Sequence, residues 1–420
     1  MLFVVKRDRR EGSEDLPVVR TENLYKVFGR RARDAVNMLK NGADPSDLDI
    51  PGVTAAVIDA SFEVGEGEIF VVMGLSGSGK STLIRMLNGI LPATSGQVYV
   101  NGEDITTMSP KQIRDMRQRT MSMVFQHFAL FPHRTVLDNA AYGLRVKGVE
   151  KAERLNKARE ALELVGLAGW EDHLPEQLSG GMRQRVGLAR ALAADTDILL
   201  MDEAFSALDP LIRREMQDQL LSLQSQLGKT IIFITHDLNE AMRLGDRIAV
   251  MRHGRIAQIG TAEEILTNPA DEYVAQFVQD VDRTRVLTAK SVMDRPVTTI
   301  GVGSGPRAAL RTMREHQHSA LFVVARDGRL AGVVTDSAAA EAAKRGVSTV
   351  QEIVSDEFSF VAPETPVSEL FTPSAESPVP LAVVDSDQRL LGVIPRATLL
   401  AALGEVTSST DVKPGVASDA

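Results

Sequence analysis

The segment 74–81, which reads GLSGSGKS, constrains the fold of this chain more than any other stretch. It lies between an apolar run at 69–73 and a segment with helical spacing that starts at residue 82. A strand, a glycine-rich turn and a helix form the context in which such a turn encloses a polyphosphate. The glycines let backbone N–H groups point inward, and the positive end of the helix dipole adds to the attraction. A glycine-rich turn with an unrelated lysine is the alternative interpretation.

The side chains in and after this turn suit a nucleotide and a metal ion. Lys80 can reach the β- and γ-phosphates as a point charge, and the Ser81 hydroxyl can be a ligand of Mg²⁺. ATP and Mg²⁺ are therefore the predicted cofactors. The residues expected to contact ATP here are Gly74, Ser76, Gly77, Ser78, Gly79, Lys80, Ser81 and Thr82.

Length, charge and composition exclude several other classes of protein. A chain of 420 residues suggests two or three domains. The net charge of −9 and the single tryptophan argue against a nucleic-acid binder, because such proteins usually carry a basic field. The absence of cysteine rules out disulfides, thiolate catalysis and Cys-based metal sites. No apolar run reaches about 18 residues and the N-terminus does not resemble a secretory signal, so we expect the chain to stay in the cytosol, where docking on a membrane protein stays open.

Strand-like and helical segments alternate along the first 240 residues. The alternation predicts an α/β fold with a largely parallel sheet, whose ligand groups lie at the carboxyl ends of its strands. The basic helical face within 135–172 is most simply a solvated surface, and contact with a partner is the alternative. The predicted strands are 18–28, 56–64, 69–73, 96–100, 121–125, 198–203 and 230–235, and helices are predicted at 32–40, within 135–172 and after residues 180 and 210.

Three of these strands end in side chains that suit phosphate chemistry. Asp202 is suited to hold Mg²⁺ through water, whereas Glu203 can face the γ-phosphate and polarise the attacking water. His236 follows the strand at 230–235, where a phosphate contact is expected, although a lone histidine is more often a surface or capping residue. Gln126 ends the strand at 121–125 and offers an amide oxygen to Mg²⁺. We therefore predict Glu203, His236 and Gln126 as catalytic residues, and Ser81, Gln126 and Asp202 as Mg²⁺ ligands.

The segment 178–184, which reads LSGGMRQ, predicts a second anion site. It places a small hydroxyl and a flexible backbone at the N-terminus of a predicted helix. The turn at 74–81 already serves the phosphates of one nucleotide. A second site in the same chain therefore makes sense if it serves the nucleotide of another subunit.

These motifs, together with SALD at 206–209, resemble those of ABC-transporter ATPases in order and approximate spacing, over residues 18–265. The resemblance implies a P-loop NTPase fold of the ABC type, with a mixed-sheet core, a helical insert at 30–52 and a helical subdomain at 120–190. It also implies a head-to-tail homodimer that encloses two ATP molecules, with Phe28 stacked on adenine, although an aromatic that ends a strand is usually core. The residues implied to contact the ATP of the partner subunit are Ser179, Gly180, Gly181, Gln184 and Asp209.

The chain is similar in particular to the ATPase subunits of osmoprotectant importers for glycine betaine, proline betaine and related quaternary amines. This resemblance rests on three features: the helical insert, the sequence of residues 201–213 and the duplicated region after residue 287. It implies three things outside the chain: an integral-membrane permease, a periplasmic or lipid-anchored substrate-binding protein, and a place on the cytoplasmic face of the inner membrane. The apolar segment 128–132 is then a docking surface for a permease helix, although buried core is its simplest interpretation.

Three alternatives to this function stay open. The nearest is an importer for another small solute, such as methionine, another amino acid or a polyamine. A soluble ABC ATPase that acts on DNA or ribosomes is less well supported, because the charge is acidic and aromatic residues are few. A ligand sensor with a vestigial ATPase is opposed by the intact set of catalytic residues.

The region after residue 287 repeats itself with an offset of 60 residues. The segments 321–324 and 327–334 align with 381–384 and 387–394, which predicts two α+β units that share one core. The repeat resembles a tandem pair of CBS domains. We expect an ATPase domain at 1–270, a linker at 271–286, CBS domains at 287–345 and 346–402, and a disordered tail at 403–420.

The predicted CBS pair departs from the family's pattern in one respect. Many CBS domains place an aspartate after the hairpin to bind a ribose, whereas Ala338 and Thr398 occupy that position here. Ordinary adenosine nucleotides are therefore doubtful ligands, and a cyclic dinucleotide at the interface of the pair stays open. Residues 287–402 hold 11 Lys+Arg and 13 Asp+Glu, so they have little attraction for anionic lipid. Ionic-strength sensing by this region rests on the resemblance alone.

Overall fold

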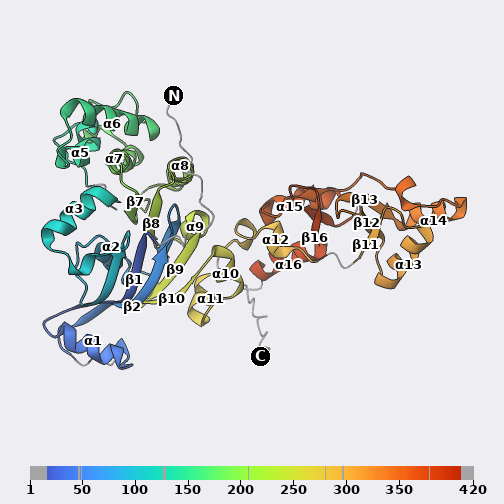
Figure 1. Ribbon diagram of the computed structural model, residues 1–420, viewed down its shortest axis with the longest axis horizontal. Coiled ribbons are helices and arrows are strands. Elements are labelled where there is room, and N and C mark those ends of the chain that lie inside the picture. Colours follow the sequence, from blue (N-terminus) through green and yellow to red (C-terminus); the bar gives the residue numbers. More distant parts are fainter. Residues whose placement is uncertain are drawn as a thin grey trace, which may run out of the picture. The chain divides into compact units, whose positions relative to one another are not determined.

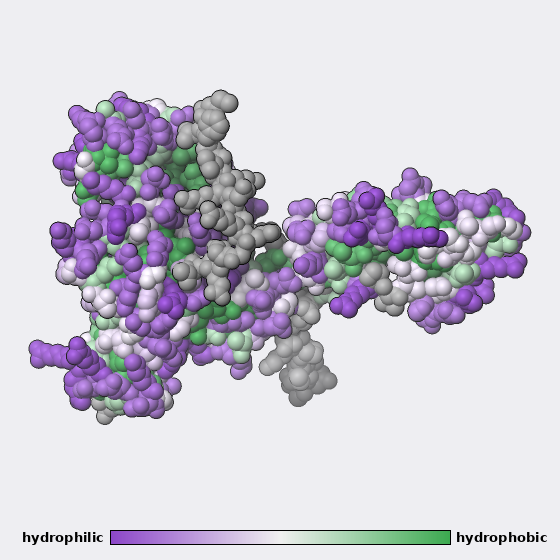
Figure 2. Space-filling view, viewed as in Figure 1, coloured by the Kyte–Doolittle hydropathy of each residue, from purple (hydrophilic) through white to green (hydrophobic). Residues whose placement is uncertain are grey.

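The first part of the chain contains two β-sheets of different kinds. The structure is a computed structural model that describes residues 17–45, 48, 50–125, 129–206, 208–279, 281–295, 298–377 and 379–407. The chain divides into two units, Met1–Val278 and Gln279–Ala420 (Figure 1). Hydrophilic residues cover most of the visible surface of both units (Figure 2).

The larger sheet of the first unit is mixed, with strand order β10-β9-β3-β8-β7-β6. Every neighbouring pair is parallel except β9 and β10. The strands β3, β7 and β8 are buried at every position, as expected for parallel strands that are covered on both faces. Their bounds are β3 (Ile69–Met73), β6 (Met121–Val124), β7 (Ile198–Asp202), β8 (Thr230–Thr235), β9 (Arg247–Arg252) and β10 (Arg255–Gly260).

The second sheet of this unit is antiparallel, with strand order β2-β1-β4-β5. One apolar core joins it to the larger sheet and to helix α2 (Lys80–Leu87), and the rings of Phe62 and Phe70 stack there with centroids 5.0 Å apart. This core fixes the start of α2 at the end of β3. The strands are β1 (Val19–Phe28), β2 (Thr54–Val64), β4 (Ser95–Val100) and β5 (Glu103–Asp104).

The remaining helices of the first unit form the insert, the helical subdomain and the cover of the sheet. Figure 1 shows α5, α6 and α7 grouped at one end of the unit, and α1 at the opposite end. The insert helix packs three buried apolar residues against β1. The helices are α1 (Ala32–Lys40), α3 (Pro110–Thr120), α4 (Val136–Ala140), α5 (Tyr142–Val146), α6 (Lys151–Leu164), α7 (Gly180–Ala193), α8 (Pro210–Leu227), α9 (Leu238–Leu244), α10 (Ala262–Thr267) and α11 (Glu272–Phe277), with 3-10 turns η2 (Ile105–Thr107) and η3 (Pro175–Gln177).

The second unit contains the same small sheet twice. In each copy a short first strand pairs parallel to the next strand, which forms an antiparallel hairpin with the third. A cluster that draws on both copies, including Phe322 and Ala382, forms the predicted shared core. The elements are β11 (Thr299–Gly301), β12 (Ala320–Val324), β13 (Leu330–Thr335), β14 (Phe360–Val361), β15 (Leu381–Val384), β16 (Leu390–Ile394), α12 (Ala289–Val292), α13 (Pro306–His316), α14 (Asp336–Arg345), α15 (Val367–Glu376), α16 (Arg396–Thr407), η4 (Arg283–Arg285) and η5 (Val350–Glu352).

The α/β class and the mixed sheet are confirmed, and the unit boundary lies later than the expected start of the linker. Helix α11 falls within the predicted linker, yet it belongs to the first unit, because Val274 is buried and the Tyr273 ring lies 4.5 Å from the Arg252 guanidinium. The short strands β11 and β14 are not predicted. The predicted tail overlaps α16 as far as Thr407, and residues 408–420 lie outside the described part of the chain.

Candidate functional site

The turn between β3 and α2 requires glycine at two points of close backbone approach. Gly74 has φ +151°, and a Cβ there would lie 2.3 Å from the Met251 carbonyl oxygen. Gly79 has φ +105°, and a Cβ there would lie 2.1 Å from the Ala56 carbonyl oxygen. Gly79 is also the residue before α2 and has no side chain to cap the helix. The first N–H groups of α2 are thus available to an anionic ligand.

Lys80 is held inside this turn. Its side chain is only 4% exposed, and its Nζ donates to the carbonyl oxygens of Gly74 at 2.8 Å and Leu75 at 3.0 Å. Burial lowers the pKa of the Lys80 ammonium, while the carboxylates of Glu203 and Asp202 act in the opposite direction. A buried ammonium whose hydrogen-bond acceptors are neutral carbonyls gains free energy when phosphate oxygens replace them.

Ser81 and Asp202 meet at the carboxyl end of β7. The Ser81 hydroxyl donates to Asp202 Oδ1 at 2.9 Å, and Arg85 Nη2 lies 3.8 Å from Asp202 Oδ2. Burial raises the pKa of the Asp202 carboxyl, which is 6% exposed. Hydroxyl and carboxylate oxygens are the ligands that Mg²⁺ prefers, and a buried carboxylate is stabilised by a cation, so this pair fits Mg²⁺. Among the described residues no group of three His, Asp or Glu side chains could hold a metal.

Glu203 and His236 form the second contact at the ends of the parallel strands. His236 Nδ1 lies 3.1 Å from Glu203 Oε2, and the Glu203 N–H donates to the Ile234 carbonyl at 2.9 Å. Glu203 has φ +46°, a left-handed conformation that is uncommon for a residue with a side chain. Such local strain is characteristic of functional positions. The turn directs the Glu203 carboxylate toward the residue that follows β8.

The starts of α7 and α8 lie against each other. The Met182 N–H donates to Ser179 Oγ at 3.2 Å, so Ser179 caps α7. Asp209 caps α8 in the same way, accepting from the Ile212 N–H at 3.1 Å. A Cβ on Gly181 would lie 2.6 Å from Ile212 Cγ2, so a larger residue would displace the Ile212 side chain where the two helices approach.

Of two predicted nucleotide contacts, the structure exposes Phe28 and buries Gln184. Phe28 ends β1 with its side chain 41% exposed and its ring centroid 5.1 Å from Lys26 Nζ, which leaves a ring face for stacking. Gln184 is fully buried in α7, and its amide atoms have no hydrogen-bond partner among the described residues. This burial therefore argues against a direct contact of Gln184 with a second chain. Gln126 lies outside the described residues.

Sequence reasoning missed Arg85, the cation beside Asp202. Ser81 and Arg85 are four residues apart on α2, so both side chains lie on the helix face toward β7. This spacing of four residues was the sequence signal that could have placed Arg85 beside Asp202. Five further polar residues behind His236 were also missed and are described below.

Family models match two parts of the chain. The model for ABC transporters matches residues 57–206, and the model for CBS domains matches residues 289–345. A large part of the first unit and the first copy of the repeat thus each have a family match.

The chain is similar over most of its length to three curated proteins. It is 53% identical to the glycine betaine transport ATP-binding protein OpuAA of Bacillus subtilis, with 92% of each chain covered. It is 49% identical to the glycine betaine/carnitine transport ATP-binding protein GbuA of Listeria monocytogenes, covering 92% of this chain and 97% of the relative. It is 46% identical to the glycine betaine/proline betaine transport system ATP-binding protein ProV of Escherichia coli, covering 91% and 96%.

Solved structures resemble the first part of the chain. A dimeric, post-hydrolysis ATP-binding cassette bound to ADP and Pi has a TM-score of 0.50 and 29% identity, covering 58% of this chain and 98% of its own. A subunit of an ABC transporter complex from Clostridium perfringens has a TM-score of 0.51 and 26% identity, covering 63% and 93%. In the part of the chain that the structure describes, no helix combines the length and apolarity that a membrane span needs.

Proposed function

Because this chain belongs to the ATP-binding subunits of ABC transporters, we propose that it hydrolyses ATP to power import of glycine betaine or a related quaternary amine. The paired contacts Ser81–Asp202 and His236–Glu203 at adjacent strand ends are the observation that carries the ATPase activity. The substrate class rests on relatives whose transport systems carry glycine betaine, carnitine or proline betaine.

The turn at 74–82 binds the phosphates of ATP, and Phe28 stacks on the adenine ring. Backbone N–H groups at the start of α2 and the Lys80 ammonium supply the positive field. Ser81 and Asp202 hold Mg²⁺, with Gln126 as the third predicted ligand. When bound, Mg²⁺ neutralises charge on the β- and γ-phosphates.

Glu203 orients the attacking water and accepts its proton. As the water oxygen bonds to the γ-phosphorus, the bond to the bridging oxygen breaks and ADP leaves. His236 fixes the Glu203 carboxylate through its Nδ1 contact. The carboxylate is therefore positioned before the nucleotide arrives.

A second copy of the chain completes each site. The starts of α7 and α8 present Ser179, Gly180, Gly181 and Asp209 to the nucleotide that is bound in the partner subunit. The solved cassette in a dimeric state with ADP and Pi supports this arrangement. Closing and opening of the pair then moves the permease between its two states.

A groove in the helical subdomain is proposed as the docking site of a permease helix. Its cavity of about 430 Å³ is lined by Met123, Phe125, Phe131 and Tyr142, among other residues. Arg190 Nη1 donates to the Ala129 carbonyl at 2.7 Å and so fixes part of the segment 128–132, whose residue 128 lies outside the described part. Binding to a permease, beside a substrate-binding protein, places the chain on the cytoplasmic face of the inner membrane.

The second unit is proposed to be a tandem CBS pair that regulates transport. A cavity of about 380 Å³ lies between its two copies, with His318, Phe322 and Val333 from the first copy and Val379 and Val393 from the second. A cyclic dinucleotide is the ligand class that we propose for this cavity. Deletion of 287–420 should remove the salt dependence of transport, and an unchanged salt response would contradict regulation by this unit.

One experiment tests the proposed function as a whole. The subunit is reconstituted in proteoliposomes with its neighbouring permease and binding protein, and ATPase activity is measured against glycine betaine at low and high internal salt. Stimulation that rises with salt supports both the importer and the sensing role. Stimulation without salt dependence supports the importer alone. An active ATPase that ignores glycine betaine would point to another solute.

A further inference from the structure

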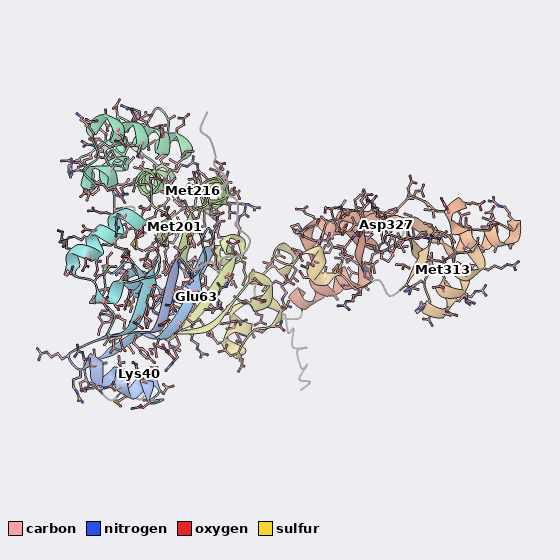
Figure 3. All side chains as sticks on the ribbon, viewed as in Figure 1. Lys40, Glu63, Met201, Met216, Met313 and Asp327 are labelled. Carbon is pink, nitrogen blue, oxygen red and sulfur yellow. The ribbon has the colours of Figure 1, made fainter. Side chains whose placement is uncertain are left out.

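A polar cluster with a buried centre and two half-buried members, Arg213 and Asp237, lies directly behind His236. It consists of Arg213 and Gln217 on α8, Thr235 at the end of β8, and Asp237 and Glu240 at the start of α9. Figure 3 labels Met216, which lies on α8 three residues after Arg213, together with Met201 in β7. None of the five residues of the polar cluster takes part in the hydrolysis steps given above.

Glu240 is the centre of this cluster. Its side chain accepts from the Thr235 hydroxyl at 2.5 Å and from Gln217 Nε2 at 3.2 Å, and Arg213 Nε lies 3.8 Å away. Glu240 is only 3% exposed, and burial raises the pKa of its carboxyl. A buried carboxylate persists only when hydrogen bonds and a cation compensate its desolvation, and here Arg213 is that cation.

Arg213 joins two loops that are distant in sequence. Its Nη1 donates to Asp237 Oδ2 at 3.1 Å, and its Nη2 donates to the Leu208 carbonyl at 3.1 Å. Leu208 directly precedes Asp209, and Asp237 directly follows His236. One planar guanidinium thus contacts both the segment that caps α8 and the segment that carries the partner of Glu203.

The His236 segment is held from its other side as well. The Asp237 N–H donates to Thr235 Oγ1 at 2.9 Å, and Asp237 Oδ1 caps α9 by accepting from the Asn239 N–H at 2.9 Å. The His236 backbone therefore lies between two residues whose side chains are fixed by the cluster. A shift of Arg213 would therefore reach His236 through its hydrogen-bonded neighbour Asp237.

We propose that Arg213 is a positioning residue for ATP hydrolysis, which couples the Asp209 segment to His236 and through it to Glu203. The inference rests on the proposed function, in which Asp209 meets the nucleotide of a second chain. Contact at Asp209 moves or fixes the Leu208 carbonyl, Arg213 follows it, and His236 is set in place against Glu203. The site would therefore hydrolyse ATP efficiently only when the partner chain is seated.

The test is a set of variants of the full chain in the reconstituted transporter. Arg213→Ala should lower kcat about tenfold or more while the KM for ATP changes less than about twofold, because the nucleotide itself is bound elsewhere. Arg213→Lys, which keeps the charge but loses the planar fork, should recover part of the loss. Arg214→Ala is the matched control, because it removes the same charge from an exposed position on the same helix.

A double-mutant cycle separates positioning from general support of the fold. If Arg213 acts through His236, Arg213→Ala should cause little further loss of kcat in a His236→Ala chain. Multiplicative losses in the double variant, or a kcat of Arg213→Ala equal to wild type, would overturn the inference. If Arg213→Ala does not fold, Asp237→Asn replaces it, since asparagine can keep the cap of α9 while losing the ion pair. A wild-type complex without ATPase activity would instead contradict the proposed function itself.

Discussion

Helices α2 and α7 both begin with a loop that contains glycine and serine, but their first turns are used differently. Before α2 stands Gly79, which cannot cap the helix, and Lys80 lies buried in the turn. Before α7 stands Ser179, whose hydroxyl already accepts the Met182 N–H. The first helix start is therefore open to a phosphate from its own chain. At the second, the Ser179 side chain already occupies one of the N–H groups, and we propose that this helix start meets a nucleotide held by another chain.

This difference predicts that the two helix starts respond differently to substitution. Damage at α2 should strongly weaken nucleotide binding by each chain alone. Damage at α7 should leave binding by a single chain intact and affect only the step that needs two chains.

The largest effect is expected for Lys80→Ala. Loss of the ammonium should weaken ATP binding about 100-fold, or ~2.8 kcal/mol, because the phosphates lose their only buried cation in the turn. Titration of a fluorescent ATP analogue measures this directly. Lys111→Ala, an exposed lysine on α3, is the control and should bind as wild type. Equal affinities of the two variants would contradict the assignment of the turn.

Glu203→Gln should separate binding from chemistry. The variant keeps its contact to His236 but cannot accept a proton, so kcat should fall by a factor on the order of 10³ while ATP binding is kept. ATPase assays and analytical ultracentrifugation with ATP measure the two properties, and the variant should stay dimeric. Turnover close to the wild-type value would remove Glu203 from its role.

Ser179→Ala tests the helix start that is already capped. Loss of the cap should destabilise the start of α7 by about 1 kcal/mol and lower kcat about tenfold, with nucleotide binding by the single chain unchanged. Thermal unfolding and ATPase assays measure the two effects. A loss of binding comparable to that of Lys80→Ala would erase the difference between α2 and α7.

Asp202→Asn should show the smallest effect, as a gain of stability in nucleotide-free protein without Mg²⁺. Burial raises the pKa of this carboxyl, so its ionised form lowers the stability of the folded state at neutral pH. The variant should unfold about 2 °C higher, or ~1 kcal/mol. The advantage should shrink as pH falls from the raised pKa toward the ordinary value, because the wild-type carboxyl is then neutral too. A difference that grows at low pH would contradict this account.

Features set by local sequence could be predicted well. The strands at 69–73 and 230–235 have the predicted bounds, since uninterrupted apolar runs with clear flanking turns leave little choice. The contact of Ser81 with Asp202 follows from placing one motif at the start of a helix and the other at the end of a neighbouring strand. The burial of Gln184 could have been anticipated, because the apolar Leu188 follows one turn later on the same face of α7.

Contacts that depend on packing between distant segments could not be predicted. Nothing near Arg213 in the sequence indicates that its guanidinium reaches both Leu208 and Asp237, because this requires the observed approach of α8 to α9. The same holds for α11, whose place in the first unit depends on the contact of Tyr273 with Arg252. Charge and polarity alone marked that region as a linker.

The central claim, that each nucleotide lies between the turn of one chain and the start of α7 of another, can be tested by cross-linking. The natural chain has no cysteine, so chains carrying only Ser76→Cys and only Ser179→Cys can be mixed in a Glu203→Gln background. With ATP and a short bifunctional maleimide, the mixture should give a covalent dimer that either chain alone does not give. Bound ATP without any cross-linked dimer in the mixture would contradict the shared site.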